Sequence, residues 1–88
     1  MGMLGMDVGE VRTFAKQLDS RADEIEQIVN TLSSALSHVQ WLGNDANGFR
    51  HDWETSHRSQ LNTVANALRD AARVANNNAN QQEQTSAS

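Results

Sequence analysis

The sequence contains neither cysteine nor proline among its 88 residues. Without cysteine the chain has no disulfide, and no metal-ligand pattern takes its place as a staple. Without proline, nothing interrupts the two long stretches of helical sequence. A chain of this length forms one small domain and buries only about 60% of its unfolded surface. We therefore expect a second chain to complete the hydrophobic core.

The chain also lacks a basic patch and a long apolar run. The chain has seven Lys and Arg residues and eleven Asp and Glu residues, which gives a net charge of −4. Nucleic-acid binding needs clustered positive charge, so we expect no nucleic-acid partner. No apolar segment approaches the ~20 residues of a membrane-spanning helix. The first residues do not resemble a Sec-type signal peptide, so export, if it occurs, is expected by a non-Sec route from the cytoplasm.

Residues that could carry chemistry are few and badly spaced. His51 and His57 are six residues apart, on opposite sides of a helix, and His38 lies near the end of the first helix. Metal-binding helices place two histidines four apart on one face, which does not occur here. No serine has a histidine and a carboxylate in a recognisable frame, and no glycine-rich phosphate loop is present. We expect a non-enzymatic protein without metal, cofactor or small-molecule substrate.

The first half of the chain has the pattern of one long amphipathic helix. Its apolar positions alternate in steps of four and three over four heptads, and Phe14 and Ile28 widen the stripe. Asp7 followed by Glu10 resembles a capping box with Asp as the N-cap. We predict a helix over about 7–40. The stripe consists of Val11, Ala15, Leu18, Ala22, Ile25, Val29, Leu32, Leu36 and Val39.

A turn is predicted at 41–44, where the sequence reads Trp41-Leu42-Gly43-Asn44. Gly43 can adopt the positive φ angle that ends a helix and reverses the chain. Trp41 can cover the end of the helices with a large apolar ring. Asn44 and Asp45 are expected to cap the N–H groups at the start of the next helix.

A second helix is predicted over about 45–77, followed by a tail. Consecutive steps of four from Trp53 to His57 to Leu61 indicate a stutter that unwinds the helix locally. We therefore expect a helical hairpin in 1–78. Residues 79–88 have one charge and no large apolar side chain, so we expect a flexible tail. The predicted second stripe is Ala46, Phe49, Trp53, His57, Leu61, Val64, Leu68, Ala71 and Ala75.

Taken together, Trp41-Leu42-Gly43 at mid-chain, the heptads on both sides and the chain length resemble the WXG family. These are small helical-hairpin proteins similar to the early secreted antigenic target of mycobacteria. The resemblance covers about residues 6–83. It implies an all-α antiparallel hairpin that pairs with a second hairpin into a four-helix bundle. It also implies export as a folded dimer by a type VII secretion system, as a virulence-associated secreted or cell-surface protein. The alternative is an intracellular helical adaptor that pairs with a larger helical effector for the effector's export.

The family's C-terminal secretion signal, Tyr-x-x-x-Asp/Glu, is degenerate in this chain. The best match is Ala79–Glu83, where alanine replaces the aromatic residue and the acid is retained. Only one member of a heterodimer needs the signal, so the resemblance favours a heterodimer over a homodimer. The partners that it implies are a second hairpin of the same type and a type VII secretion ATPase. The expected dimer and core interface is Val11, Leu18, Ile25, Val29, Leu32, Leu36, Val39, Phe49, Trp53, Leu61, Val64 and Leu68.

Overall fold

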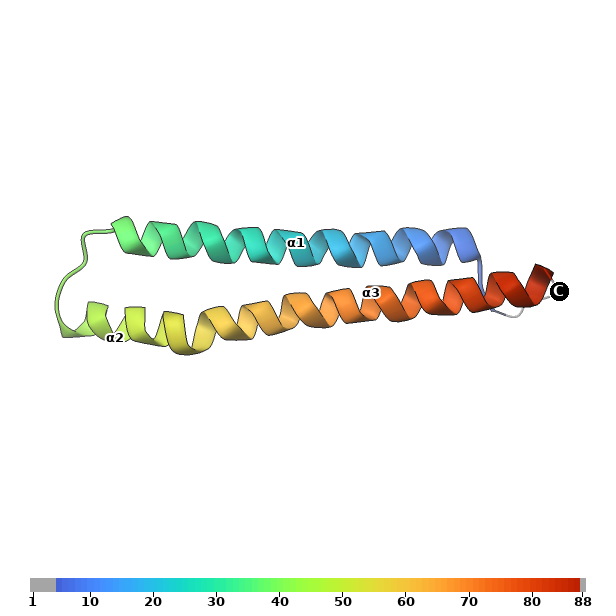
Figure 1. Ribbon diagram of the computed structural model, residues 1–88. Helices are drawn as coiled ribbons and strands as arrows, with labels where there is room; N and C mark the ends of the chain where they lie inside the picture. The colour runs from blue at the N-terminus through green and yellow to red at the C-terminus, as the bar shows by residue number, and fades with distance from the viewer. Residues whose placement is uncertain (1–4, 88) are drawn as a thin grey trace.

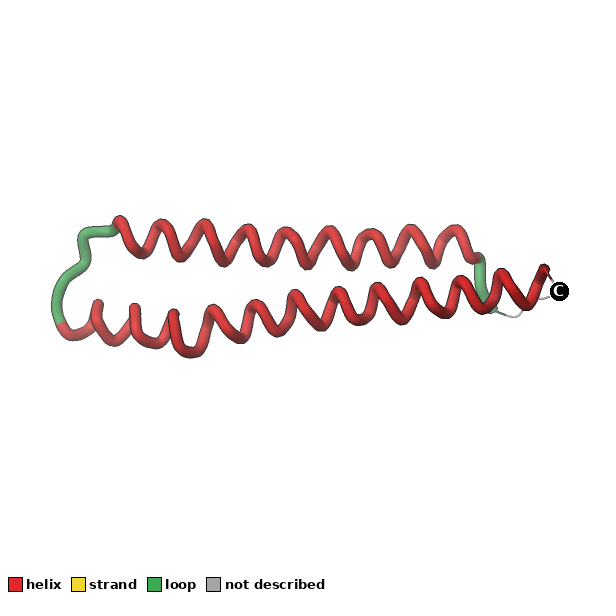
Figure 2. Tube along the Cα trace, in the orientation of Figure 1, coloured by secondary structure: helices red, strands yellow, loops and turns green. Residues whose placement is uncertain are grey.

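The computed structural model describes residues 5–87, with side chains over 5–85, and is an antiparallel helical hairpin (Figure 1). Helix α1 (Val8–His38) packs along α3 (Arg58–Ala87). Helix α2 (Asn44–Asp52) and a short π-helix, η1 (Trp53–His57), join the turn to α3. Figure 2 shows helix along almost the whole described chain. The predicted all-α hairpin is confirmed for the described residues. Residues 1–4 of the predicted hairpin and Ser88 of the predicted tail lie outside the described part.

The first helix begins as predicted and ends slightly earlier. The Asp7 side chain accepts a hydrogen bond from the Glu10 backbone N–H at 3.0 Å, which confirms Asp7 as the N-cap. The helix ends at His38, and Val39 is already extended. The connection to α2 therefore covers 39–43, one residue longer than the predicted turn 41–44 and starting two residues earlier.

Gly43 has the predicted positive φ, but it serves the second helix rather than the first. Its φ is 108° and its ψ 179°, a region that is accessible almost only to glycine. Gly43 is the N-cap of α2, and no side chain caps this helix. Asn44 and Asp45 are the first two residues of α2, so their predicted capping role is wrong. Gly43 occupies the N-cap position, so Asn44 is already helical. An N-cap residue would need a non-helical, extended backbone.

We expect Gly43→Val to destabilise the hairpin by on the order of 1–3 kcal/mol, because valine is strained at this φ and ψ. A Cβ at Gly43 would meet no other atom within 4 Å, so the cost isolates the backbone. Gly48 is the matched control, since it is helical and has equally open surroundings. Gly48→Ala should stabilise by about 0.5–1 kcal/mol. Equal melting of Gly43→Val and the parent would exclude a positive-φ requirement.

The predicted stutter takes the form of the π-helix η1. The Arg58 backbone N–H donates to the Trp53 carbonyl, five residues back, instead of the usual four. This wider turn absorbs one extra residue and changes which side of the second stripe faces α1. After η1 the buried positions are Ala65, Ala72 and Ala79, whereas the predicted Val64 and Ala71 are exposed. Within a single hairpin the α1–α3 seam is therefore formed by residues one position after Val64 and Ala71 of the predicted stripe.

Alanine dominates the contact between the two long helices. Ala15, Ala22 and Val29 on α1 recur every seven residues, as do Ala65, Ala72 and Ala79 on α3, and all six are at most 1% exposed. Small side chains at this seam let the two helices approach closely. The hairpin is 66 Å long but only 17 Å wide and 15 Å deep. Such a seam buries little apolar surface. The larger apolar side chains lie beside it and stay partly or largely exposed.

Helix α3 continues to Ala87 instead of ending at about 77. The described residues of the predicted tail, 79–87, are therefore helical. Ala79 is fully buried, and Arg12 binds both Glu83 and Asn80. The bonds from Arg12 join residues about seventy positions apart in sequence, so the local composition of the tail does not indicate them.

Candidate interaction surface

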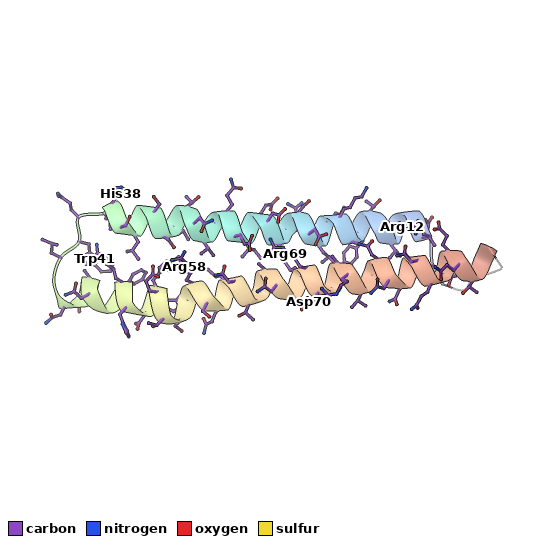
Figure 3. All side chains as sticks on the ribbon, viewed as in Figure 1. Arg12, His38, Trp41, Arg58, Arg69 and Asp70 are labelled. Atoms are coloured by element: carbon purple, nitrogen blue, oxygen red, sulfur yellow. The ribbon has the colours of Figure 1, made fainter. Side chains whose placement is uncertain are left out.

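The hairpin has a polar face held by arginines that bridge the two long helices. Arg69 on α3 binds Asp23 and Glu26 on α1, each at 2.8 Å. Arg12 binds Glu83 at 3.0 Å near the open end of the hairpin (Figure 3). Exposed ion pairs contribute little stability. Their main effect is to fix which residues of α1 and α3 face each other.

The opposite face is apolar. Phe14 and Ile28 each precede a buried residue of the α1 seam by one position, and Val64 precedes Ala65 on α3 in the same way. In an antiparallel pair these positions lie on the same side of the seam, away from the ion pairs. The exposed large side chains of this apolar face are Phe14, Ile28, Leu32, Val39, Trp41, Phe49 and Val64. Half-buried beside them are Val11, Leu18, Ile25, Leu36, Leu61 and Leu68.

At the closed end the apolar face is hollowed into what we call the turn groove. Its volume is about 330 Å³. Trp41 packs against Phe49 at its rim, with ring centroids 5.4 Å apart and planes tilted by 47°. Trp53 is only 8% exposed, and its indole Nε1 donates to Ser33 Oγ at 2.8 Å. The lining residues are Leu32, Ala35, Leu36, Val39, Trp41, Phe49 and Trp53.

Trp41 covers the end of the hairpin only in part. It remains 38% exposed, and the neighbouring Leu42 is 91% exposed. Trp53 is the tryptophan that is buried between the helices. Figure 3 shows Trp41 at the turn end of the molecule, beside α2. The tripeptide Trp41-Leu42-Gly43 therefore supplies a groove wall, an exposed leucine and a backbone turn.

Arg50 bonds the backbone at the turn groove, a role that no pattern in the sequence indicated. Its guanidinium donates to the carbonyl oxygens of Trp41 at 2.8 Å and Val39 at 3.1 Å. It also reaches the carbonyl of Leu36 at 3.5 Å. These carbonyls lack helical partners because α1 ends at His38. Ser33, which binds Trp53, was likewise not predicted, since both contacts join residues far apart in the sequence.

Ala79 and Glu83 both lie where α3 packs along α1. Ala79 is fully buried in the helix seam, and Glu83 pairs with Arg12. The hydrogen bond from Arg12 is the main cause that lowers the pKa of Glu83 below its usual value of 4.5, and the positive charge of Arg12 adds to it. Buried Ala79, the Arg12–Glu83 ion pair and the hydrogen bond from Arg12 to Asn80 thus hold the last turns of α3 on α1.

The lowered pKa predicts that the end of α3 loosens in acid. A carboxylate whose folded-state pKa is lowered stabilises the fold above the unfolded pKa and loses that effect as the pH falls through the folded value. Backbone chemical shifts over 79–85 should therefore move toward unfolded values below about pH 4.5. Glu83→Gln should remove this step, whereas Glu24→Gln, within the Arg21 pair of α1, should keep it. An unchanged step in Glu83→Gln would refute the assignment.

Comparison with known proteins identifies no relative: no family model, curated protein or solved structure matches the chain. No helix within the described residues is long and apolar enough to cross a membrane. Over the same residues, no three His, Asp or Glu side chains come together as a metal site. The apolar face with its turn groove is therefore the feature from which we infer function.

Proposed function

We propose that this protein is a non-enzymatic subunit that pairs with a second helical hairpin to form a four-helix bundle. In this proposal the pair is a substrate of a type VII secretion system, as the resemblance to the WXG family implies. The apolar face is the observation that supports pairing, because seven large apolar side chains remain exposed on one side of the hairpin. Soluble monomers rarely expose a contiguous apolar patch of more than a few hundred Å².

The composition of the helix seam adds a physical reason for pairing. Burial of apolar surface contributes roughly 25 cal/mol per Å², and alanine offers little surface to bury. In the part of the chain with described side chains, six of the eight buried residues, in the seam and at the turn, are alanines. Valine and tryptophan supply the rest, so one hairpin gains little from its own core. A partner laid on the apolar face would bury the larger side chains that the seam leaves out.

The state of the pure protein tests pairing. Sedimentation velocity at micromolar concentration, with binding of a hydrophobic dye, separates three results. A dimer with low dye binding supports pairing. A loosely folded, dye-binding monomer that becomes ordered with a neighbouring-gene hairpin also supports it. A tightly folded monomer with low dye binding contradicts the proposal, because its apolar face would need no cover.

Export tests the secretion role separately from pairing. The parent chain would be expressed in cells with an active type VII system, with and without a partner hairpin that has a tyrosine in its tail. We expect export of the parent to depend on that partner, because Ala79 offers no aromatic anchor for a secretion ATPase. Export of the parent alone would remove the preference for a signal-bearing partner. Retention in the cytoplasm with every partner would favour the intracellular adaptor.

A further inference from the structure

We propose that the polar face of the hairpin binds an extended peptide segment of another protein through the side-chain carboxamides of Asn30, Asn62 and Asn66. These three residues line a hollow on the side of the helix seam that carries the arginine ion pairs. The inference goes beyond the proposed function, because a hairpin laid on the opposite, apolar face leaves this hollow open. Peptide binding and pairing are therefore separate properties, and either one can fail without the other.

The first reason is that the hollow contains carboxamides without partners. It has a volume of about 430 Å³ and lies beside the ion pair of Arg69 with Glu26. Its lining is Glu26 and Asn30 of α1 with Asn62 and Asn66 of α3. Within the described part of the chain, no group bonds the carboxamides of these three asparagines. Each carboxamide therefore has two N–H donors and one oxygen acceptor to offer a ligand.

The second reason is the spacing of the asparagines along α3. Asn62 and Asn66 are four residues apart, which is about 6 Å along a helix. In an extended peptide the N–H and C=O groups of every second residue point to the same side, with a repeat of about 6.6–6.8 Å. One carboxamide can accept from the N–H and donate to the C=O of the same peptide residue. Asn62 and Asn66 are thus spaced to bind two alternate residues of one peptide, and Asn30 faces them from α1.

The surroundings of the hollow favour a peptide over other ligands. Glu26 is the one carboxylate of the lining, and Arg69 already binds it, so a divalent cation would find too little negative charge. No aromatic side chain lines the hollow, so a nucleobase would have no ring on which to stack. Asp23 and Glu26 together bind the single positive charge of Arg69. The remaining negative charge favours a peptide that has a basic residue.

NMR titration of the isotope-labelled protein, in the assembly that the pure chain forms, tests the site. The probe is the acetylated and amidated peptide Thr-Val-Thr-Lys-Thr, which is β-branched and basic. We expect it to shift the side-chain NH₂ signals of Asn30, Asn62 and Asn66 at millimolar concentration. Asn66→Ala should weaken binding about tenfold, because it removes two hydrogen bonds. Asn77→Ala is the matched control, since Asn77 is an exposed asparagine of α3 that does not line the hollow.

Methylation of the peptide backbone supplies a readout that leaves the protein unchanged. Methyl groups on the second and fourth nitrogens leave one full alternate set of N–H groups, so binding should persist. Methyl groups on the third and fourth nitrogens leave no two free N–H groups two residues apart, so binding should be lost. Equal binding of the two methylated peptides would overturn the proposed backbone contact.

The remaining outcomes separate this proposal from the proposed pairing. Absence of shifts with the unmethylated peptide, or an equal loss from Asn77→Ala and Asn66→Ala, would overturn the peptide site. Shifts of the same signals by a soluble oligosaccharide, without shifts by the peptide, would overturn it in favour of a glycan. A chain that sediments as a tightly folded monomer and still binds the peptide would support the site while contradicting pairing.

Discussion

Trp53→Ala is expected to remove a large share of the stability of the isolated hairpin. Trp53 is 8% exposed, sits where α2 meets the π-helix, and donates to Ser33. Replacing a buried tryptophan by alanine typically costs about 3–5 kcal/mol. Small domains have little stability to lose, since the whole free energy of unfolding is about 5–15 kcal/mol. Thermal melting by circular dichroism at one low protein concentration measures the effect.

Two control variants separate the ring of Trp53 from its hydrogen bond and from the tryptophan of the turn. Trp53→Phe keeps most of the apolar ring and loses only the bond to Ser33, so it should cost much less. Trp41→Ala should also cost less, because Trp41 is 38% exposed. The sequence predicted that Trp41 covers the end of the helices and that Trp53 belongs to the core or interface; the structure buries Trp53 and leaves Trp41 partly exposed. A larger loss of stability from Trp41→Ala than from Trp53→Ala would contradict this assignment.

Ala72→Leu is expected to destabilise the hairpin by about 1–3 kcal/mol through overpacking. Ala72 is 1% exposed in the seam between α1 and α3, so a leucine there must push the helices apart. Ala71→Leu is a matched control with the same substitution one position earlier, on an exposed site. It should leave the folding of the hairpin nearly unchanged. The free energies of unfolding of both variants can be compared by urea titration.

This pair of variants also decides the register of α3. The predicted stripe passes through Ala71, whereas the structure buries Ala72. If Ala71→Leu were the more damaging of the two, the sequence-based register would be right and the effect of the π-helix on the seam would be refuted. Because Ala71 borders the apolar face, a change in self-association without a change in folding would agree with the structure.

Sequence alone determined the features that depend on local chemistry. The heptad stripes predicted both long helices, Asp7 was correctly identified as a cap, and glycine at 43 predicted the positive φ of the turn. The step of four at Trp53 predicted the unwound segment that is the π-helix. In each case the signal lies within a few residues of its effect, so no distant contact was needed to infer it.

Only the tertiary structure decided which side of each stripe is buried and where α3 ends. Ala71 and Ala72 both fit a heptad stripe, and the choice depends on how α1 lies against the helix after η1. The residues around Ala79 are polar enough to predict disorder, yet Ala79 and Glu83 order them through contacts with α1. These contacts join residues close in space and remote along the chain. Local composition could not indicate them, because the energy that orders the segment comes from the other helix.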